Sequence, residues 1–333
     1  MERLSQFLKL YHANSKGRFN FPQMEVRTYR KAIYKAQNTL EHSGELILGP
    51  GVAKFESDMA EWIGNGITSD QVVGVATGTD AIELALMSCG IETNQHVALP
   101  SHTAYGTVAA ILRIGAIPIF VDIDSKSPTI CPRDLKQKLK ENHKIRAVIA
   151  VHLYGEACQL DTLIQLCKTY SIPLIEDCAQ ACGTLYKGKP VGSFGDRSAF
   201  SFYPTKNLSA SGDAGALIVK ESGEELQRAR RLRFYGWDAS REAVQKGVNS
   251  RLDELQALIL SEKLPDLSKR IKQRREVAKE YITELSPLLD SSNLLSLPKD
   301  GEEWEHSFHL FVIRLSSHYR DYVMHSCLTK GIP

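Results

Sequence analysis

Two stretches of sequence decide the fold: Ile172-Pro-Leu-Ile-Glu-Asp-Cys-Ala-Gln180 and Ser201-Phe-Tyr-Pro-Thr-Lys-Asn-Leu208. The first is a short apolar run that ends in two carboxylates, which is typical of a buried parallel strand whose carboxyl end opens into a crevice. The second places Lys206 after an aromatic and β-branched segment that also indicates a strand. We therefore expect the carboxylate of Asp177 and the amine of Lys206 at the same edge of one sheet.

Composition and charge narrow the class of protein. With 333 residues, 43% of them hydrophobic and 24% charged, the chain suits a soluble protein with one large domain and a smaller one. The net charge is only +2 and there are no blocks of like charge, so the sequence does not indicate binding to nucleic acid or to an anionic membrane. Neither a signal peptide nor a membrane span is expected. Seven cysteines without CxxC pairs favour a reducing cytoplasm.

From residue 71 onward, short apolar strands alternate with amphipathic helices. This pattern predicts an α/β fold whose mainly parallel sheet is flanked by helices on both faces. The predicted strands are 72–76, 96–99, 118–121, 147–151, 173–175, 198–203, 215–219 and 309–314, with a hairpin near 187–190. The predicted helices are 80–89, 107–114, 133–140, 162–170, 224–233, 252–288 and 317–330. We expect a large domain at 1–235, which includes a helical segment at 1–45, and a smaller α/β domain at 236–333.

Ligands bind beyond the carboxyl ends of parallel strands, so one rim of the sheet is the candidate site. Free N–H groups after Thr77, helped by the Thr79 hydroxyl, would hold a phosphate, although a plain N-cap explains the same residues. Asp177 can equally cap a helix, Lys206 can be a solvated lysine, and Ser201 alone carries no signal. Their joint order, with a phosphate loop before a strand-end acid and a lysine, is what a pyridoxal phosphate transaminase requires. The rim comprises 77–79, 101–105, 152–155, 177–180 and Lys206.

Six motifs in one order strengthen this interpretation. They are Gly78-Thr-Asp-Ala81, Pro100-Ser-His-Thr103, Val151-His-Leu-Tyr-Gly155, Glu176-Asp-Cys-Ala-Gln180, Phe200-Ser-Phe-Tyr-Pro-Thr-Lys-Asn-Leu208 and Asn249-Ser-Arg-Leu-Asp-Glu-Leu-Gln-Ala257. Together they resemble the DegT/DnrJ/EryC1/StrS family of pyridoxal phosphate-dependent nucleotide-sugar aminotransferases, from residue 44 to the C-terminus. The resemblance implies an aspartate-aminotransferase-like fold. Tyr235-Gly-Trp237, taken with Asn249-Ser-Arg-Leu252, resembles the branch that aminates C3 of dTDP-3-keto-6-deoxyhexoses.

The resemblance also implies roles for single residues. Lys206 matches the catalytic lysine that bonds to the cofactor, Asp177 matches the acid that pairs with its pyridine nitrogen, and Gln180 lies near its phenolic oxygen. Stacking on the pyridine ring is assigned to His102. Tyr105 is the alternative, unless it is only a packed residue of the first helical turn. No metal is expected.

The remaining positions complete a phosphate site and imply a partner. Gly78, Thr79 and Ser201 match phosphate-binding positions, and Asn249 matches an asparagine that reaches the phosphate from the partner subunit. A homodimer with shared active sites is therefore implied. The expected reaction moves an amino group from an amino acid, with glutamate expected, to a keto-sugar nucleotide.

Two departures from the family pattern stand out. Ser209 replaces a frequent glycine, which predicts that a serine must adopt a glycine's backbone conformation. Relatives also continue beyond Pro333 with a strand, a loop and a closing helix, so the smaller domain is expected to be incomplete. The alternative function is thus a truncated, non-catalytic or regulatory member of the same fold.

Overall fold

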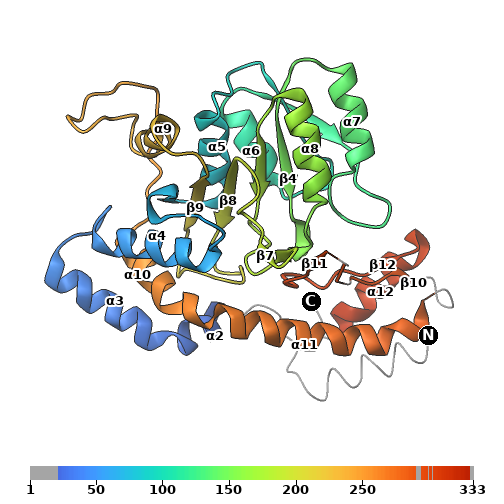
Figure 1. Ribbon diagram of the computed structural model, residues 1–333. Coiled ribbons are helices and arrows are strands. Elements are labelled where there is room, and N and C mark those ends of the chain that lie inside the picture. The colour runs from blue at the N-terminus through green and yellow to red at the C-terminus, as the bar shows by residue number, and fades with distance from the viewer. Residues whose placement is uncertain (1–21, 290–293, 299, 302, 331–333) are drawn as a thin grey trace.

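The centre of the molecule is a seven-stranded sheet in the order β1-β9-β8-β5-β4-β2-β3 (Figure 1). This computed structural model describes residues 22–289, 294–298, 300–301 and 303–330. Neighbouring strands from β8 to β3 pair in parallel, and only β9 runs antiparallel to both of its neighbours. The predicted mainly parallel sheet is confirmed. Its strands are β1 (Val72–Val75), β2 (His96–Pro100), β3 (Ile117–Val121), β4 (Ile145–Val151), β5 (Leu174–Asp177), β8 (Arg197–Ser201) and β9 (Gly215–Val219).

Helices cover both faces of this sheet, which explains why most residues of its strands are apolar and buried. The edge strand β3 is partly exposed. Val148 and Ile149, which are adjacent in β4, belong to two different hydrophobic cores, one on each face. The first core is covered by α4 (Pro50–Ile63), α7 (Pro132–Glu141), α8 (Leu160–Tyr170) and α10 (Glu254–Lys263), and the second by α5 (Gly78–Ser88), α6 (Tyr105–Arg113) and α9 (Glu224–Leu232). Of these helices, α4 was not predicted from the sequence.

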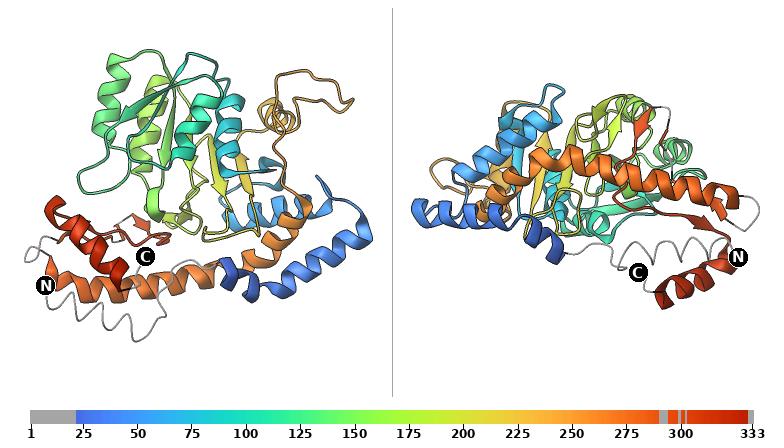
Figure 2. Two further views of the ribbon diagram at one scale, coloured as in Figure 1. Left: turned by 180° about the vertical axis from the view of Figure 1, so that it is seen from behind. Right: turned by 90° about the horizontal axis from the view of Figure 1, so that it is seen from below.

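Helices from both ends of the described chain, α2 (Pro22–Thr28), α3 (Arg30–Ser43) and α11 (Leu267–Leu285), lie along one side of the sheet (Figure 2). The predicted helix at 252–288 is divided into α10 and α11 by a 3₁₀ turn, Leu264–Asp266. The hairpin predicted near 187–190 is confirmed, because β6 (Leu185–Tyr186) and β7 (Lys189–Pro190) pair there in antiparallel fashion. Residues 1–21 of the predicted N-terminal helical segment lie outside the described residues. The other elements are β10 (Leu294–Ser296), β11 (Trp304–Glu305), β12 (Arg314–Leu315) and α12 (Ser317–Thr329).

The strand predicted at 309–314 is wrong, because only its last residue is in a strand, β12. The backbone at Phe308 is left-handed, with φ +47°, and Arg274 Nη1 donates to the Phe308 carbonyl over 3.1 Å. Two residues further on, the N–H of Leu310 donates to the carbonyl of Tyr154. Since these backbone groups have partners outside a ladder, the apolar run docks on the sheet domain and does not extend a sheet.

The seven cysteines are all free thiols. None of the helices in the described ranges is long and apolar enough to cross a membrane.

Candidate active site

Asp177 ends β5 and is almost completely buried, with 4% of its surface exposed. Thr107 Oγ1 donates to its Oδ2 over 2.8 Å, and the Ala179 N–H donates to its Oδ1 over 3.0 Å. Burial raises the pKa of Asp177, and these two hydrogen bonds together with the nearby charge of Lys206 offset only part of that rise. The carboxylate is therefore a buried acid that a cationic ligand group would stabilise further.

Lys206 follows β8 in a turn where its N–H donates to the carbonyl of Tyr203 over 2.8 Å. Burial lowers the pKa of its amine, and the charge of Asp177 opposes that shift. The two residues that the sequence placed on one rim thus lie within electrostatic reach of each other. A lysine with a lowered pKa is unprotonated more often, which makes it a better nucleophile and base.

The start of α5 offers an anion site. Thr77 is the N-cap, because its Oγ1 accepts the Asp80 N–H over 3.0 Å. The backbone N–H groups of Gly78 and Thr79 then have no acceptor in the described part of the chain. A Cβ on Gly78 would lie 2.5 Å from Cβ of Ser201, so only glycine lets that serine approach the helix start. Thr77 thus caps the helix as the plain N-cap alternative predicted, and the two free donors leave the phosphate site a prediction.

Asn249 lies at the surface with an exposed side chain. Its neighbour Ser250 is buried, donates from Oγ to Asp80 Oδ2 over 2.8 Å, and accepts the Ala76 N–H over 3.1 Å. Arg113 Nη1 also pairs with Asp80, over 2.8 Å. The loop that carries Asn249 is therefore anchored beside the start of α5, while the asparagine amide finds no polar partner within the described ranges.

Gln180 and His102 are joined by Tyr154, which the sequence placed on the rim without assigning it a role. The N–H of Tyr154 donates to Gln180 Oε1, and its hydroxyl is hydrogen-bonded to His102 Nε2, both over 2.8 Å. Tyr105, the alternative stacking residue, is 74% exposed at the first position of α6.

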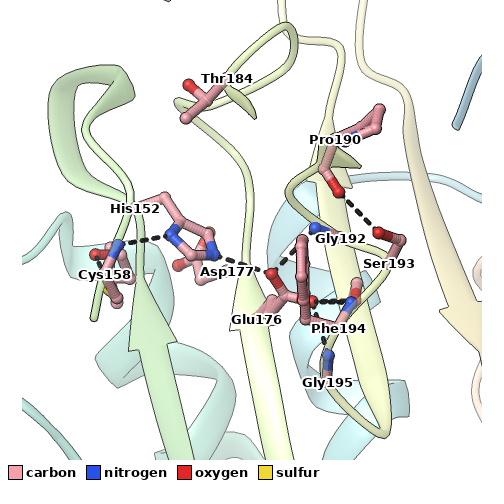
Figure 3. Close-up of polar contacts among 12 residues, drawn as sticks. His152, Cys158, Glu176, Asp177, Thr184, Pro190, Gly192, Ser193, Phe194 and Gly195 are labelled. Carbon is pink, nitrogen blue, oxygen red and sulfur yellow. Dashed lines mark hydrogen bonds and ion pairs between the residues drawn. The ribbon is translucent and has the colours of Figure 1, made fainter. Parts of the chain in front are cut away.

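On the other face of β5, Glu176 is fully buried (Figure 3). It accepts hydrogen bonds from His152 Nε2 over 3.0 Å and from three backbone N–H groups, those of Gly192, Phe194 and Gly195. Burial alone would raise the pKa of Glu176, but His152 and the backbone donors lower it.

Donor atoms of His152, Glu176 and Cys178 lie within 4.8 Å of one another, a spacing that a metal ion could use. The geometry argues against that use. His152 Nδ1 accepts the Cys158 N–H over 3.0 Å, and both carboxylate oxygens of Glu176 already accept hydrogen bonds. The cluster is therefore a saturated structural network.

Two further residues near the rim were missed. Thr107 had a usable signal, because it lies four residues after Thr103 near the start of a predicted helix on the rim, and the two hydroxyls are hydrogen-bonded. His309 had none, since it lay inside the apolar run that was assigned to a strand. Burial lowers its pKa to about 3, and the charges of Lys206 and Arg274 act in the same direction. His309 is therefore a neutral imidazole close to the lysine.

The expectation for Ser209 is wrong, because its backbone is not left-handed. The residue is buried and binds Lys263 instead: Lys263 Nζ donates to its carbonyl over 2.5 Å and to its hydroxyl over 2.9 Å. The same Nζ lies 2.9 Å from Glu25 Oε2 in α2. The loop that carries Lys206 is thus tied to the N-terminal helices.

The fold and this rim define a class: α/β proteins in which a buried strand-end acid, a lysine of lowered pKa and a helix start with free N–H groups lie on one rim of the sheet. The sequence profile of the DegT/DnrJ/EryC1/StrS aminotransferase family matches residues 28–333, and the chain belongs to that family. The resemblance inferred from the motifs is confirmed.

Relatives with named activities cover most of the chain. The dTDP-3-amino-3,4,6-trideoxy-alpha-D-glucose transaminase of Micromonospora megalomicea subsp. nigra is 40% identical over 87% of this chain and 76% of its own length. The dTDP-3-amino-3,6-dideoxy-alpha-D-galactopyranose transaminase of Aneurinibacillus thermoaerophilus is 40% identical over 88% and 77%. The crystal structure of S. venezuelae DesV superposes with a TM-score of 0.87 at 33% identity, over 95% of this chain and 82% of that one. The aspartate-aminotransferase-like expectation for the fold is therefore supported by solved aminotransferases.

Proposed function

We propose that this aminotransferase uses pyridoxal phosphate to move an amino group from an amino acid, with glutamate expected, to C3 of a dTDP-3-keto-6-deoxyhexose. One observation carries the proposal: the buried carboxylate of Asp177 and the amine of Lys206, whose pKa is lowered, share one rim with a helix start that has free N–H donors. Bound pyridoxal phosphate supplies the electron sink for amino transfer.

The residues present fit that cofactor. The free N–H groups of Gly78 and Thr79, with the nearby hydroxyl of Ser201, form a cradle for its phosphate, and a Cβ at position 78 would fill that cradle. The under-bonded acid Asp177 suits a protonated pyridine nitrogen, because a cation would recover what burial costs the carboxylate. Gln180 then donates from Nε2 to the phenolic oxygen.

The chain's own residues account for the proton movements. Lys206 Nζ would hold the cofactor covalently, and its free amine would take up and return a proton at the reacting carbons. Its lowered pKa favours the unprotonated amine that this role needs. His102 would stack on the ring, and the exposed Asn249 would reach the phosphate bound to a partner subunit in a homodimer. We also propose a cytoplasmic location and a division into domains at 1–235 and 236–333.

Support for the sugar comes from the relatives, because both of the transaminases described above are named for dTDP-3-amino sugars. The NtdA structure from Bacillus subtilis, which holds the aminated cofactor PMP, superposes with a TM-score of 0.82 at 27% identity, over 91% of this chain and 68% of that one. These likenesses favour catalysis over the non-catalytic alternative.

The test is to add pyridoxal phosphate to the purified protein and record its visible absorbance, and then to measure amino transfer from glutamate. We expect a visible band that is absent in Lys206→Ala, and transfer to a dTDP-3-keto-6-deoxyhexose but not to its 4-keto isomer. A protein that takes up no cofactor would support the non-catalytic alternative. Equal transfer to both isomers would remove the C3 assignment.

A further inference from the structure

The turn after β4 contains a residue in an unfavourable backbone conformation. Tyr154 has φ +62° and ψ −2°, in the left-handed region that bulky residues avoid. Such a conformation persists only where the surroundings enforce it, and it is found most often at functional sites. The next residue is a glycine, Gly155, which also has a positive φ and could have made the sharp turn alone.

Three polar groups of Tyr154 form hydrogen bonds with three different segments of the chain. Its N–H donates to Gln180 Oε1 over 2.8 Å, and its hydroxyl is hydrogen-bonded to His102 Nε2 over 2.8 Å. Its carbonyl accepts the Leu310 N–H over 3.2 Å. The rings of Tyr154 and His102 meet edge to face, with centroids 5.8 Å apart. The left-handed backbone is what lets one residue reach the loop after β2, the turn after β5 and the C-terminal segment together.

The bond to Gln180 fixes the orientation of the side-chain amide. An amide has one acceptor end and one donor end, and the acceptor end is occupied by the Tyr154 N–H. Only Nε2 is then available as a donor to the phenolic oxygen of the cofactor. A reversed amide would place NH₂ against the backbone N–H, which is unfavourable.

The C-terminal segment is docked on the same turn. The Ser307 N–H donates to the Gly155 carbonyl over 3.1 Å, and Thr184 Oγ1 donates to that carbonyl over 2.7 Å. A Cβ on Gly155 would lie 2.5 Å from Ser307 Oγ, so the approach depends on glycine. His309, which lies close to Lys206, belongs to this docked segment. Tyr154 therefore connects the C-terminal segment to His102 and Gln180, the two side chains predicted to contact the cofactor ring.

We propose that Tyr154 is a positioning residue: its hydroxyl orients the imidazole of His102 and its N–H orients the amide of Gln180, so that both meet the cofactor ring in one geometry. This inference rests on the proposed function. It adds a role for Tyr154, a residue of the motif Val151-His-Leu-Tyr-Gly155 to which the family resemblance assigned none.

The first test is Tyr154→Phe, which removes the hydroxyl and keeps the ring and all backbone contacts. We expect the dissociation constant of pyridoxal phosphate, measured by titration of the apoprotein, to rise about 2- to 10-fold, as for loss of one hydrogen bond. We also expect a changed circular dichroism of the bound cofactor's visible band, which reports how the ring is held. The apoprotein's unfolding midpoint should stay close to that of the wild type, whereas a merely structural role would lower it and leave the dichroism unchanged.

Tyr186→Phe is the matched control. Tyr186 is 2% exposed, and its hydroxyl donates to Glu303 over 3.1 Å. The same hydroxyl accepts the Asp161 N–H over 3.5 Å, so the control loses a tyrosine hydroxyl with both of its hydrogen bonds. We expect no change in the affinity for the cofactor or in its dichroism.

His102→Phe removes the same hydrogen bond from its other side and keeps an aromatic ring. If Tyr154 acts through His102, the double variant Tyr154→Phe/His102→Phe should bind pyridoxal phosphate no more weakly than His102→Phe alone. Additive losses in the double variant would overturn the inference, and so would wild-type affinity and dichroism in Tyr154→Phe. If the wild type itself binds no cofactor, the proposed function fails first, and the two failures are thereby distinguished.

Discussion

Two adjacent carboxylates at the end of β5, those of Glu176 and Asp177, are both buried but differ in their hydrogen bonds and in the direction of their pKa shifts. Glu176 is 0% exposed and Asp177 is 4% exposed. Because successive strand residues face opposite sides of the sheet, they meet different surroundings. Glu176 accepts hydrogen bonds from His152 and three backbone N–H groups, whereas Asp177 accepts two from the part of the chain that the structure describes. Accordingly, the pKa of Glu176 is lowered and that of Asp177 is raised.

This contrast separates a structural carboxylate from a functional one. The protein completes the hydrogen bonding of Glu176 and thereby holds the loop at 192–195 against β5. It leaves Asp177 under-bonded, and the residual unfavourable free energy can be recovered only by a ligand cation. When each acid is replaced by its amide, we therefore expect changes of opposite sign in the free energy of unfolding of the apoprotein.

The largest effect is expected from removing the cationic neighbour of Asp177. Lys206→Ala should lower the turnover number by at least about 10⁴-fold, because it deletes the covalent attachment point and the general base together. The apoprotein should fold with near-normal stability, since the amine that is lost was buried and carried a lowered pKa. Lys35→Ala is the control, because Lys35 is exposed and pairs with Glu262. Similar losses of turnover in both variants would contradict the assignment.

Asp177→Asn should lower turnover on the order of 10²–10³-fold, as for loss of a preorganised charge, while it stabilises the apoprotein. The pKa of Asp177 is raised in the folded state, so ionisation of this group opposes folding as pH rises through that pKa. The stability gained over the wild type should therefore be present at neutral pH and absent in acid. Chemical denaturation of both apoproteins at the two pH values is the measurement. If Asp177→Asn instead destabilises the apoprotein at neutral pH, Asp177 is a structural carboxylate like Glu176.

Glu176→Gln should do the reverse. It leaves His152 and three N–H groups facing one amide that can accept only at its oxygen, and we expect the free energy of unfolding to fall by about 3 kcal/mol. Because the pKa of Glu176 is lowered in the folded state, its stabilisation is present above the unfolded pKa and lost as pH falls through the folded pKa. The difference from the wild type should thus shrink in acid. Turnover at saturating cofactor should fall far less than in Asp177→Asn; the opposite ranking would refute the contrast.

A smaller effect is expected at the tie between α2 and the loop after Lys206. Glu25→Gln weakens the pairing with Lys263, whose Nζ also holds Ser209, and should lower the free energy of unfolding by about 1–2 kcal/mol. The matched control is Glu262→Gln, since the Glu262 pair is exposed and should contribute under 1 kcal/mol. Both losses of unfolding free energy are read from denaturation midpoints at unchanged slope. Equal losses in the two variants would show that the Glu25–Lys263 pair is no stronger than an exposed ion pair.

The sequence predicted those parts of the molecule that depend on local pattern and topology. Apolar runs and the strand-end rule brought Asp177 and Lys206 to one rim without any knowledge of contacts. The start of α4 could not be found in this way, because its N–H groups at Gly51 and Val52 are capped by the carboxylate of Glu254, some two hundred positions along the chain. Residues whose conformation depends on such distant partners carry no signal of their own.

The same reason explains the errors near the site. Tyr154 is left-handed because His102, Gln180 and Leu310 hold it, and none of the three is close to it in sequence. The apolar run at 309–314 has a strand-like composition, yet Arg274 and the turn at 153–155 occupy its backbone groups. Periodicity reports which residues are buried; it does not report which backbone groups are already bonded.

The finest test of the contrast is Thr107→Val, which removes one of the two donors to Asp177 and keeps the shape of the side chain. The pKa of Asp177 should then rise further, because a hydrogen bond to the ionised form is lost. The part of the cost that comes from Asp177, about 1–2 kcal/mol, should be present at neutral pH and vanish in acid, where the carboxyl is neutral with or without the hydroxyl. The lost hydrogen bond to Thr103 should cost the same at both pH values. Thr39→Val is the control, since Thr39 Oγ1 donates only to the Lys35 carbonyl on an exposed helix and its loss should not depend on pH. Turnover should fall only a few-fold, because the Ala179 N–H still orients the acid. A pH-independent loss in Thr107→Val would mean that this hydroxyl contributes packing alone, and Asp177 would then be held by the backbone without help from α6.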